Sequence, residues 1–354
     1  MKTVTINTAS KAYDVVVGAD LLDEAGAFIR KAAGGQAAAI VADDIVAELY
    51  GKRLSDSLAK SGYRTAQFIF PHGESSKNAE NFLSLLSFLA EEKISRADTV
   101  VALGGGVTGD LAGFAAASYM RGIRFVQVPT TLLAAVDSSV GGKTAINLAA
   151  GKNLAGAFYQ PDLVLCDVST LSTLPPEIFR DGCAEVIKHG MIKDYKLFES
   201  LKTPIHAQLE EIIARNVEIK SEIVAEDEFE KGKRKLLNFG HTVAHAIEAL
   251  SGYRISHGQA VAAGMAIETR VSFRLGLCDK KCLGELLKML ELYELPVNTS
   301  YEADELARAC LIDKKRDGKY LSMIFPLAVG LCIYKDMPVS ELEDLIRYGL
   351  EESQ

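Results

Sequence analysis

Residues 99–153 read TVVALGGGVTGDLAGFAAASYMRGIRFVQVPTTLLAAVDSSVGGKTAINLAAGKN. The apolar, β-branched run Thr99–Leu103 predicts a buried strand, and three glycines, Gly104–Gly106, follow it directly. A helical pattern of residues then begins at Thr108. A strand, a glycine turn and a helix in this order bring backbone N–H groups close to a phosphate at the helix N-terminus. The segment therefore predicts a phosphate-binding turn in an α/β fold.

Residues 104–109, GGGVTG, fit the dinucleotide-binding pattern G-x-G-x-x-G in the required context of strand and helix. The acidic residue expected about 20 positions later is missing, because no Asp or Glu lies between Asp110 and Asp137. A dinucleotide site is favoured, and a tight turn without a ligand is the alternative. A triphosphate-binding loop at Gly142-Lys143-Thr144 is excluded, because Asp137 stands where that loop needs its first glycine.

A second strand is expected at Ile123–Val128, and it runs into Pro129-Thr130-Thr131 and another helical pattern. That pattern ends in small and polar residues, namely Asp137, Ser138, Ser139, Gly141, Gly142, Lys143 and Thr144. Lys152 and Asn153 close the segment. So few bulky side chains beside so many hydrogen-bonding groups predict a ligand that lies along the backbone.

Length, hydrophobic content and net charge limit the number of domains and the kind of partner. The chain has 354 residues, which suggests two domains, and 48% of them are hydrophobic, enough for a large core. The net charge of −8 argues against nucleic acid or an anionic membrane as the main partner. The N-terminus does not read as a signal peptide, and no apolar run is long enough to span a bilayer. We expect a cytosolic protein.

The six cysteines are scattered along the chain, and we expect reduced thiols. Cys278 and Cys282 have a spacing that metal ligands use, but nearby partners are absent. Thiols in the core or on a helix surface are the favoured interpretation.

Residues 1–160 alternate predicted strands and helices, which is the order of a mainly parallel sheet covered on both faces. The expected strands before residue 99 are Val4–Ile6 and Tyr13–Val17, as an antiparallel pair, then Ala37–Val41 and Thr65–Phe70. Helices are expected up to about Lys60 and over Asn81–Glu92. Ligands of such sheets bind beyond the carboxyl ends of the strands. Asp43, Glu74, Lys77 and Gly105 fall at these ends, and solvated loop charge is the alternative for the first three.

After Leu163–Val168 the pattern becomes helical. Helices are expected at Pro176–Ile192, Ile205–Asp227, Leu236–Leu250, Gln259–Leu275, Leu283–Tyr293, Ala303–Ile312 and Ser340–Leu350, and strands at Tyr320–Ile324 and Gly330–Tyr334. We predict an α/β domain over residues 1–160 and a mainly helical domain over residues 161–354.

Histidines gather in the second half of the chain. His241 and His245 are four residues apart and share one helix face. His257 follows at the start of the next helix, and Glu185 lies in CAEVIKHG. Imidazoles and one carboxylate suit a catalytic zinc ion with an open position. Spacing nominates His241 and His245 as ligands and leaves the third open among His257, His189 and Glu185. A histidine cluster that only packs helices is the alternative.

Basic and amide side chains fall near the same motifs. They are Arg121, Lys143, Lys152, Lys188, Lys220, Arg234 and Lys314, with Asn153 and Asn238 beside them. Singly, each reads as surface charge, but together they would hold a phosphate and a carboxylate. The residues thus predict a metalloenzyme that uses a nucleotide cofactor on a small anionic substrate.

Six segments together resemble the 3-dehydroquinate synthase family. They are GGGVTGDLAGFAAASYMRG, VPTTLLAAVDSSVGGKTAIN, GKNLAGAFYQP, AEVIKHG, LNFGHTVAHAIE and HGQAVAAGM. The resemblance covers nearly the whole chain and is strongest over residues 99–265. The wider superfamily includes polyol dehydrogenases and cyclases that make deoxyinosose or valiolone. Those cyclases usually depart from the VDSSVGGKT pattern, which is complete here.

The resemblance implies an N-terminal Rossmann-like domain, a helical C-terminal domain and an active site in the cleft between them. It also implies tightly held NAD, one zinc ion (with another divalent metal such as cobalt as an alternative) and a cytoplasmic homodimer. By motif, the zinc ligands would be Glu185, His241 and His257. His245 would then face the substrate phosphate, which replaces the ligand pair nominated by spacing.

The resemblance also assigns the remaining site residues. NAD contacts would come from Asp43, Glu74, Lys77, Gly105, Gly106, Val107, Thr108, Gly109, Asp110, Thr130, Thr131, Lys143, Lys152, Thr170, Leu171, Ser172 and Thr173. Substrate contacts and catalysis would fall to Arg121, Asp137, Lys143, Lys152, Asn153, Lys188, Lys220, Arg234, Asn238, His245 and Lys314. Glu74 and Lys77 at the adenosine end would explain the missing acidic residue. Lys315, next to Lys314, is an alternative for that position. His72 departs from the residues that the family often has before Gly73-Glu74.

The implied reaction converts 3-deoxy-D-arabino-heptulosonate 7-phosphate to 3-dehydroquinate and phosphate. It runs through transient oxidation by NAD, β-elimination of phosphate, re-reduction, ring opening and an intramolecular aldol closure. NAD is regenerated in each turnover, so no net oxidation is expected.

Overall fold

The computed structural model describes residues 1–230, 232–314 and 319–351, and the side chains of residues 312–314 are not described. The chain forms two compact units. Unit 1 comprises Met1–Pro175 and Leu209–Glu228, and unit 2 comprises Pro176–Gln208 and Phe229–Gln354. The sheet-bearing unit therefore continues past the predicted boundary at residue 160 and includes a later segment. Among the described residues, no helix has both the length and the apolar character that crossing a bilayer requires.

Unit 1 is built on a sheet that has seven strands in the described part of the chain, in the order β1-β2-β9-β6-β5-β3-β4. The strands are β1 (Lys2–Asn7), β2 (Ala12–Gly18), β3 (Ala37–Asp43), β4 (Arg64–Phe70), β5 (Thr99–Gly104), β6 (Arg124–Pro129) and β9 (Leu163–Asp167). All neighbouring strands are parallel except the edge pair β1 and β2. The predicted α/β class and the antiparallel N-terminal pair are confirmed.

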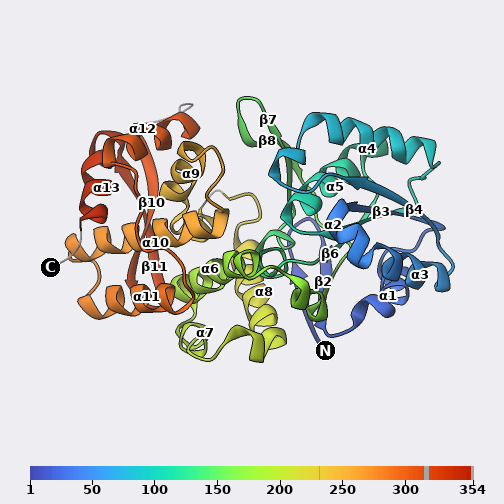
Figure 1. Ribbon diagram of the computed structural model, residues 1–354, viewed down its shortest axis with the longest axis horizontal. Helices are drawn as coiled ribbons and strands as arrows, with labels where there is room; N and C mark the ends of the chain where they lie inside the picture. Colours follow the sequence, from blue (N-terminus) through green and yellow to red (C-terminus); the bar gives the residue numbers. More distant parts are fainter. Residues whose placement is uncertain (231, 315–318, 352–354) are drawn as a thin grey trace. The chain divides into compact units, whose positions relative to one another are not determined.

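Helices cover both faces of this sheet. Alternate residues of a strand point to opposite faces, so β5 sends Val101 and Leu103 to one core and Val100 and Ala102 to the other. The first core contains α1 (Ala25–Ala32) and α3 (Lys52–Lys60), and the second contains α4 (Ala79–Glu91) and α5 (Gly106–Ser118). Figure 1 shows the two pairs on opposite sides of the sheet. A short helix, α2 (Asp44–Val46), follows β3.

The carboxyl ends of the parallel strands carry the predicted NAD contacts. Asp43 ends β3, Glu74 follows β4, Gly105 follows β5, and Thr130 follows β6. The turn after β9 is a 3-10 helix over Val168–Thr173. Parallel strands end at one edge of a sheet, so residues far apart in the sequence share that edge.

A hairpin that the sequence analysis missed follows the polar cluster. β7 (Lys143–Leu148) pairs antiparallel with β8 (Gly151–Phe158). Its glycines, alanines and asparagines have low strand propensity, so the pattern gave no strand signal. Gly156 is needed for the pairing, because a Cβ there would lie 2.1 Å from the Thr144 carbonyl oxygen. The predicted helical pattern before the hairpin ends in a π-helix over Ala134–Ser138.

One helix of the second half belongs to unit 1. α8 (Leu209–Glu226) packs against β1 and β2, and the Met1 amino group pairs with Glu210 at 2.9 Å. At its end, Glu228 accepts hydrogen bonds from the Ser10 backbone N–H (3.1 Å) and from Gln160 Nε2 (2.9 Å). The helix was predicted, but an amphipathic pattern shows only that one face is buried. It does not show which unit buries that face.

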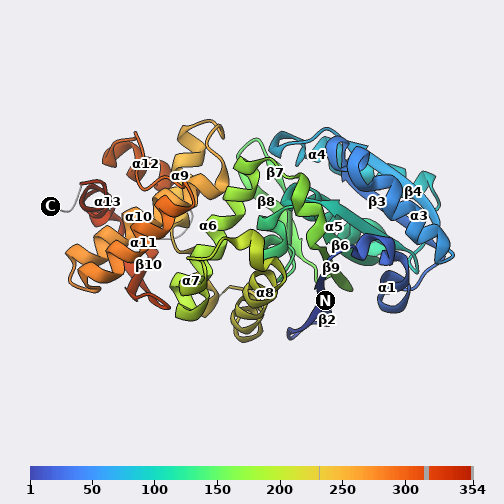
Figure 2. The same ribbon diagram turned by 60° about the horizontal axis from the view of Figure 1, so that its bottom comes forward.

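Unit 2 is mainly helical, as predicted. Its described helices are α6 (Pro176–Lys193), α7 (Tyr195–Ser200), α9 (His241–Leu250), α10 (His257–Arg274), α11 (Lys280–Leu292), α12 (Ala303–Lys314) and α13 (Leu342–Leu350), with a hairpin of β10 (Tyr320–Ala328) and β11 (Leu331–Pro338). α10 is almost wholly buried and runs between α9 and α11 (Figures 1 and 2). α9 begins later than the predicted Leu236, because Gly240 adopts φ 79° and interrupts the helix. All six cysteines are buried, and none forms a disulfide.

Candidate active site

Three side chains from three helices of unit 2 converge. Glu185 comes from α6, His241 from the first residue of α9 and His257 from the first residue of α10. Their ligand atoms all lie within 4.8 Å of one another. Glu185 Oε1 lies 3.6 Å from His241 Nε2 and 3.3 Å from His257 Nε2, and Glu185 is 1% exposed.

These distances fit a bound divalent metal. Ligand atoms about 2.1 Å from a tetrahedral zinc ion lie about 3.4 Å apart. The two measured separations bracket that value. Two imidazoles and a carboxylate are also the ligand types of catalytic zinc sites that keep one position open.

Glycines let the helices approach closely enough to form this group. A Cβ on Gly258 would lie 2.3 Å from Asp181 Cα, so the start of α10 rests directly on α6. Asp181 also accepts a hydrogen bond from Ser256 Oγ at 2.6 Å. Glu185 is one turn after Asp181, and this contact therefore places it beside His257. Gly240 and Gly264 make the matching contact between α9 and α10.

The structure groups the histidines differently from what their spacing in the sequence suggested. His245 is exposed, its ring centroid lies 5.7 Å from that of His241, and it is not in the group of converging ligand atoms. His189 is buried on α6 and does not join His241 and His257 in that group. The geometry therefore groups His241 with His257 and Glu185 and leaves His245 outside that group. The potential ligand atoms of the trio suggested by the family motifs do converge.

The electrostatics act in opposite directions on the two histidines of the trio. Burial, followed by the nearby Lys188 ammonium, lowers the pKa of His241 to about 3. Burial also lowers the pKa of His257, but hydrogen bonds to Glu185 and Glu248 outweigh it and raise that pKa to about 10. The carboxylates therefore hold a proton on His257, and a divalent cation would take its place.

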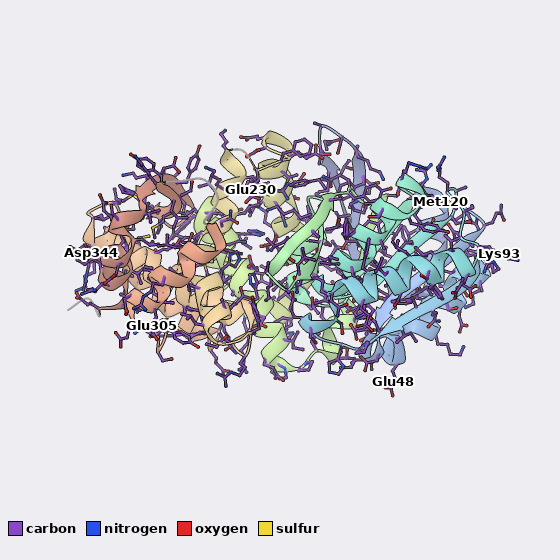
Figure 3. All side chains as sticks on the ribbon, turned by 90° about the horizontal axis from the view of Figure 1, so that it is seen from above. Glu48, Lys93, Met120, Glu230, Glu305 and Asp344 are labelled. Atoms are coloured by element: carbon purple, nitrogen blue, oxygen red, sulfur yellow. The ribbon has the colours of Figure 1, made fainter. Side chains whose placement is uncertain are left out.

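Other predicted site residues of unit 2 lie on α6 and on the 3-10 helix Lys233–Asn238 before α9. Lys188 is 1% exposed and pairs with Glu185 one turn earlier on α6. Arg234 is also 1% exposed, and Asn238 Nδ2 donates to Glu230 Oε1 at 2.7 Å (Glu230 is labelled in Figure 3). The Lys314 side chain and all of Lys315 lie outside the described residues.

In unit 1, the glycine turn forms a backbone cradle. Gly105 precedes α5, whose first turn leaves N–H groups without helical partners. A Cβ on Gly105 would lie 3.1 Å from Thr131 Cγ2, and one on Gly106 would lie 3.1 Å from Ser138 Oγ. Side chains at these two positions would crowd Thr131 and Ser138, and glycine avoids this contact. The remaining predicted members Val107, Thr108, Gly109 and Asp110 form the first turns of α5.

Two buried hydroxyls lie at this edge of the sheet. The Oγ1 atoms of Thr108 and Thr130 are buried and have no hydrogen-bond partner among the residues that the structure describes. Buried polar groups are usually hydrogen-bonded, so these atoms indicate a place for a polar ligand or water. Thr131 Oγ1, by contrast, accepts from the Ala134 N–H at 3.2 Å.

Glu74, Lys77 and Asp110 form an ionic cluster around the buried Lys77 ammonium. Lys77 Nζ lies 3.2 Å from Glu74 Oε1 and 3.0 Å from Asp110 Oδ2, and Lys77 is only 5% exposed. Burial lowers the pKa of Lys77, but the two carboxylates outweigh it and raise the pKa. Burial also raises the pKa of Asp110. The solvated-charge alternative is therefore wrong for Lys77.

Asn147 in β7 ties this cluster to the hairpin, and the sequence analysis did not single it out. Its Nδ2 donates to Glu74 Oε1 at 2.8 Å, and its backbone N–H donates to the Lys77 carbonyl at 2.8 Å. Its Oδ1 accepts from the Asn153 N–H at 2.9 Å. No motif in one segment reveals contacts among three segments.

Other predicted NAD residues have structural partners of their own. Asp43 Oδ1 caps α2 by accepting from the Val46 N–H at 2.9 Å. In the turn after β9, Thr170 Oγ1 donates to the Asp167 carbonyl at 2.7 Å, and Leu171 is buried. In the same turn, Ser172 Oγ donates to the Ser169 carbonyl, and Thr173 Oγ1 lies 2.6 Å from Tyr50 Oη.

The predicted substrate residues of unit 1 fall on the hairpin, the α5 end and α8. Lys143 begins β7, while Lys152 and Asn153 lie in β8, where Asn153 has φ 56°. Arg121 follows α5 with φ 67°, next to exposed Met120 (Figure 3). Lys220 of α8 pairs with Asp137, donating to its carbonyl at 2.6 Å and to its carboxylate.

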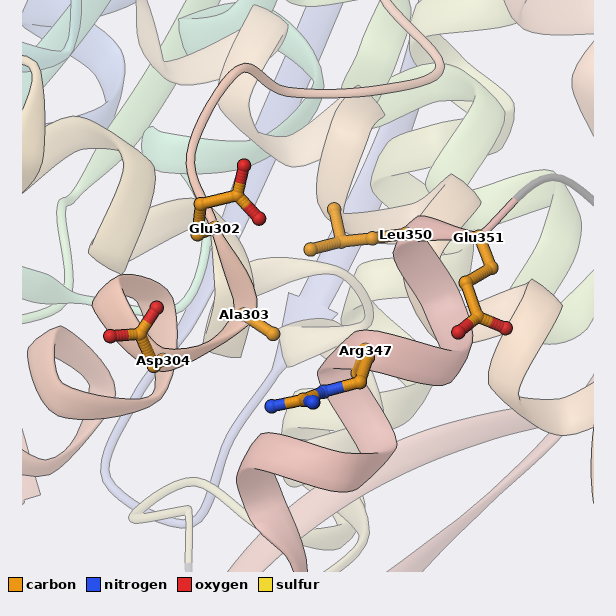
Figure 4. Close-up of a pocket in the computed structure, with 6 residues that line it drawn as sticks. All are labelled: Glu302, Ala303, Asp304, Arg347, Leu350 and Glu351. Atoms are coloured by element: carbon orange, nitrogen blue, oxygen red, sulfur yellow. The ribbon is translucent and has the colours of Figure 1, made fainter.

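A separate pocket lies on unit 2 between the start of α12 and the end of α13 (Figure 4). It is lined by Glu302, Ala303, Asp304, Arg347, Leu350 and Glu351. Its charged groups form ordinary surface pairs, such as Arg308 with Asp304 and Arg274 with Glu351. We assign no ligand to it.

Comparison with known proteins decides the family. The family model for the 3-dehydroquinate synthase N-terminal domain matches residues 67–181, and that for the C-terminal domain matches residues 182–316. A 3-dehydroquinate synthase from Caulobacter vibrioides (strain NA1000 / CB15N) is 45% identical over 346 residues, covering 93% of this chain and 94% of the relative. The chain belongs to the 3-dehydroquinate synthase family.

Solved structures of related synthases share the fold of this chain. A 2-deoxy-scyllo-inosose synthase complexed with carbaglucose-6-phosphate, NAD+ and Co2+ has a TM-score of 0.87 and 28% identity, and the match covers 99% of this chain and all (100%) of that one. The 2-epi-5-epi-valiolone synthase from Streptomyces hygroscopicus subsp. jinggangensis 5008, with NAD+ and Zn2+ bound, has a TM-score of 0.84 and 30% identity over 98% of each chain. The α/β unit followed by a helical unit is thus the architecture of these proteins.

Proposed function

We propose that this chain is a 3-dehydroquinate synthase, a lyase of the shikimate pathway. It converts 3-deoxy-D-arabino-heptulosonate 7-phosphate to 3-dehydroquinate and phosphate. The observation that carries the proposal is the convergence of Glu185, His241 and His257 at zinc-like separations in a member of this family. The identity of 45% to a curated synthase favours this reaction over those of the cyclases at 28–30%.

Glu185, His241 and His257 would hold the divalent metal. Two structural neighbours bind Co2+ and Zn2+, and the donor set here suits either ion. When bound, such an ion supplies Lewis acidity toward substrate hydroxyls. The three protein ligands leave a position open, which a catalytic site requires.

Unit 1 would hold NAD along the carboxyl edge of its sheet. The cradle at Gly105 and Gly106 suits a pyrophosphate at the N-terminus of α5, and Thr108 and Thr130 offer unpartnered buried hydroxyls. When bound, NAD supplies an oxidation that is reversed within the turnover. The cluster of Glu74 and Lys77 would serve the adenosine end.

The basic side chains would bind the two anionic groups of the substrate. Lys188 and Arg234 are buried cations, and a guanidinium presents several donors to one phosphate or carboxylate. Lys220 pairs with Asp137 in unit 1, and its ammonium would bind an anionic group of the substrate in place of that carboxylate. Exposed His245 lies one turn after His241, where its imidazole would face the leaving phosphate without ligating the metal.

The deciding experiment supplies the heptulosonate phosphate to the purified chain with NAD and Zn2+. Phosphate release and absorbance of NADH are followed together, and a chelated sample is the matched control. Release of phosphate with dehydroquinate formed, no net NADH and loss of activity in the chelated sample is the expected result. Net NADH without phosphate would instead identify a polyol dehydrogenase. Turnover of a different sugar phosphate alone would identify a sibling cyclase.

The family resemblance further supports a cytoplasmic homodimer. Sedimentation equilibrium would give a mass of twice 38.2 kDa for a dimer. Fractionation of the source cells would test the location.

A further inference from the structure

Both metal-facing imidazoles are oriented in the same way. His241 and His257 each present Nε2 to Glu185 Oε1, at 3.6 Å and 3.3 Å. Each ring therefore has its Nδ1 on the side away from Glu185. The atom that Nδ1 meets there decides the tautomer, because a neutral imidazole carries its proton on one nitrogen only.

The two Nδ1 atoms meet different acceptors. His241 Nδ1 lies 3.1 Å from the carbonyl oxygen of Phe239, two residues earlier in the chain. His257 Nδ1 lies 3.5 Å from Glu248 Oε2. A metal-bound histidine usually donates its second N–H to a carbonyl or carboxylate, which sets the ring's orientation and raises the basicity of the ligating nitrogen.

Glu248 is built into the site by the fold. It lies on α9 seven residues after His241, on the same helix face, and it is 4% exposed. Its own carbonyl accepts from the Tyr253 N–H at 2.8 Å and from Ser251 Oγ at 2.9 Å, which fixes the loop that leads to α10. Its buried carboxylate lies beside His257, the first residue of α10.

We propose that Glu248 is a positioning residue for the metal centre, holding His257 with its proton on Nδ1 and its Nε2 lone pair directed toward the metal. The inference rests on the proposed function, because it assumes that Glu185, His241 and His257 hold the metal. The proposal also says which carboxylates would balance the charge of the cation. A divalent cation would meet one negative charge from Glu185 among its ligands and a second from Glu248 behind His257.

The test is Co2+ binding by the full-length chain after removal of bound metal, followed by visible absorption and by thermal unfolding of the metal-free protein. Glu248→Ala should weaken Co2+ binding by about 10- to 100-fold and change the absorption band. Glu248→Gln should lose less affinity than Glu248→Ala, because the amide oxygen still accepts from Nδ1. Ser251→Ala is the matched control, since it disturbs the same loop without touching His257, and it should bind Co2+ as the wild type does.

Two results would overturn the inference while leaving the metal centre in place. Wild-type Co2+ affinity and spectrum in Glu248→Ala, whatever its melting temperature, would reduce Glu248 to a structural role. Complete loss of binding in both Glu248 variants, matching His257→Ala, would make Glu248 a ligand rather than a positioning residue. A wild-type chain that binds no Co2+ would overturn the proposed metal centre and this inference with it.

Discussion

Asp98 should control the stability of unit 1 without touching its ligand-binding edge. This carboxylate is 6% exposed and lies before β5, at the amino end of the sheet. Its Oδ1 accepts from the backbone N–H groups of Gln36 and Ala37, both at 2.8 Å. Its Oδ2 accepts from the Ser95 N–H at 2.8 Å and from Ser95 Oγ at 2.6 Å. Four donors thus join the start of β3 to the turn before β5.

Asp98→Asn keeps the shape and removes half of this acceptor set. An amide nitrogen in place of Oδ2 faces the Ser95 N–H, while the Ser95 hydroxyl can rotate and accept instead. A hydrogen bond to a charged group is worth about 1.5–3 kcal/mol, so losing one fully and weakening the others should cost about 2–4 kcal/mol. The variant should unfold at lower urea concentration while its NAD affinity stays that of the wild type.

The pH dependence gives a second readout of the same carboxylate. Burial raises the pKa of Asp98, but the hydrogen bonds from Ser95 and from the Ala37 and Gln36 amides outweigh it and lower the pKa. A lowered folded-state pKa means that its stabilisation is full above about pH 4 and is lost as the pH falls further. The acid loss of stability should therefore be smaller in Asp98→Asn than in the wild type.

Urea unfolding followed by circular dichroism between pH 3 and pH 7 measures both effects. Asp14→Asn is the matched control, because exposed Asp14 accepts one hydroxyl bond from Thr5 at 2.7 Å and should change stability by less than about 0.5 kcal/mol. A loss below about 1 kcal/mol in Asp98→Asn, or an acid profile identical to that of the wild type, would refute the reasoning.

Three further predictions concern the site. His245→Ala should retain stoichiometric Zn2+ and slow phosphate release, whereas His241→Ala should lose the metal; equal metal loss in the two would refute the separation of roles. Asn147→Ala removes the bonds to Glu74 and the hairpin, so it should weaken NAD binding by about tenfold in a fluorescence titration, at about 1.4 kcal/mol; unchanged affinity would count against it. Gly258→Ala places a Cβ 2.3 Å from Asp181 Cα, so it should weaken Zn2+ binding and lower the melting temperature, and wild-type values for both would contradict the packing argument.

The features that the sequence predicted correctly are local ones. The glycine turn between β5 and α5, the antiparallel pair of β1 and β2, and the helices of unit 2 follow from periodicity over a few residues and from glycine placement. The family motifs also selected Glu185, His241 and His257, which the fold brings together. Local patterns suffice for these features, because hydrogen bonding within a segment and burial of one face determine them.

Other features depend on contacts between segments far apart in the chain. Spacing favoured His245 as a partner of His241, since four residues make one helical turn. The histidine that converges with His241 is instead His257, because the contact between Gly258 and Asp181 brings α10 onto α6. The β7–β8 hairpin likewise depends on Gly156 and on pairing that its own residues do not favour.

The sequence alone therefore determined the α/β and helical halves, the glycine turn between β5 and α5 and the residue types available for a metal. Tertiary structure alone decided that α8 joins unit 1, that Lys77 is a buried ion-pair member and that Glu248 lies behind His257. The physical reason is that a residue's type and periodicity reveal that a face or charge must be satisfied. They do not reveal which distant segment satisfies it, because that follows from the packing of all elements together.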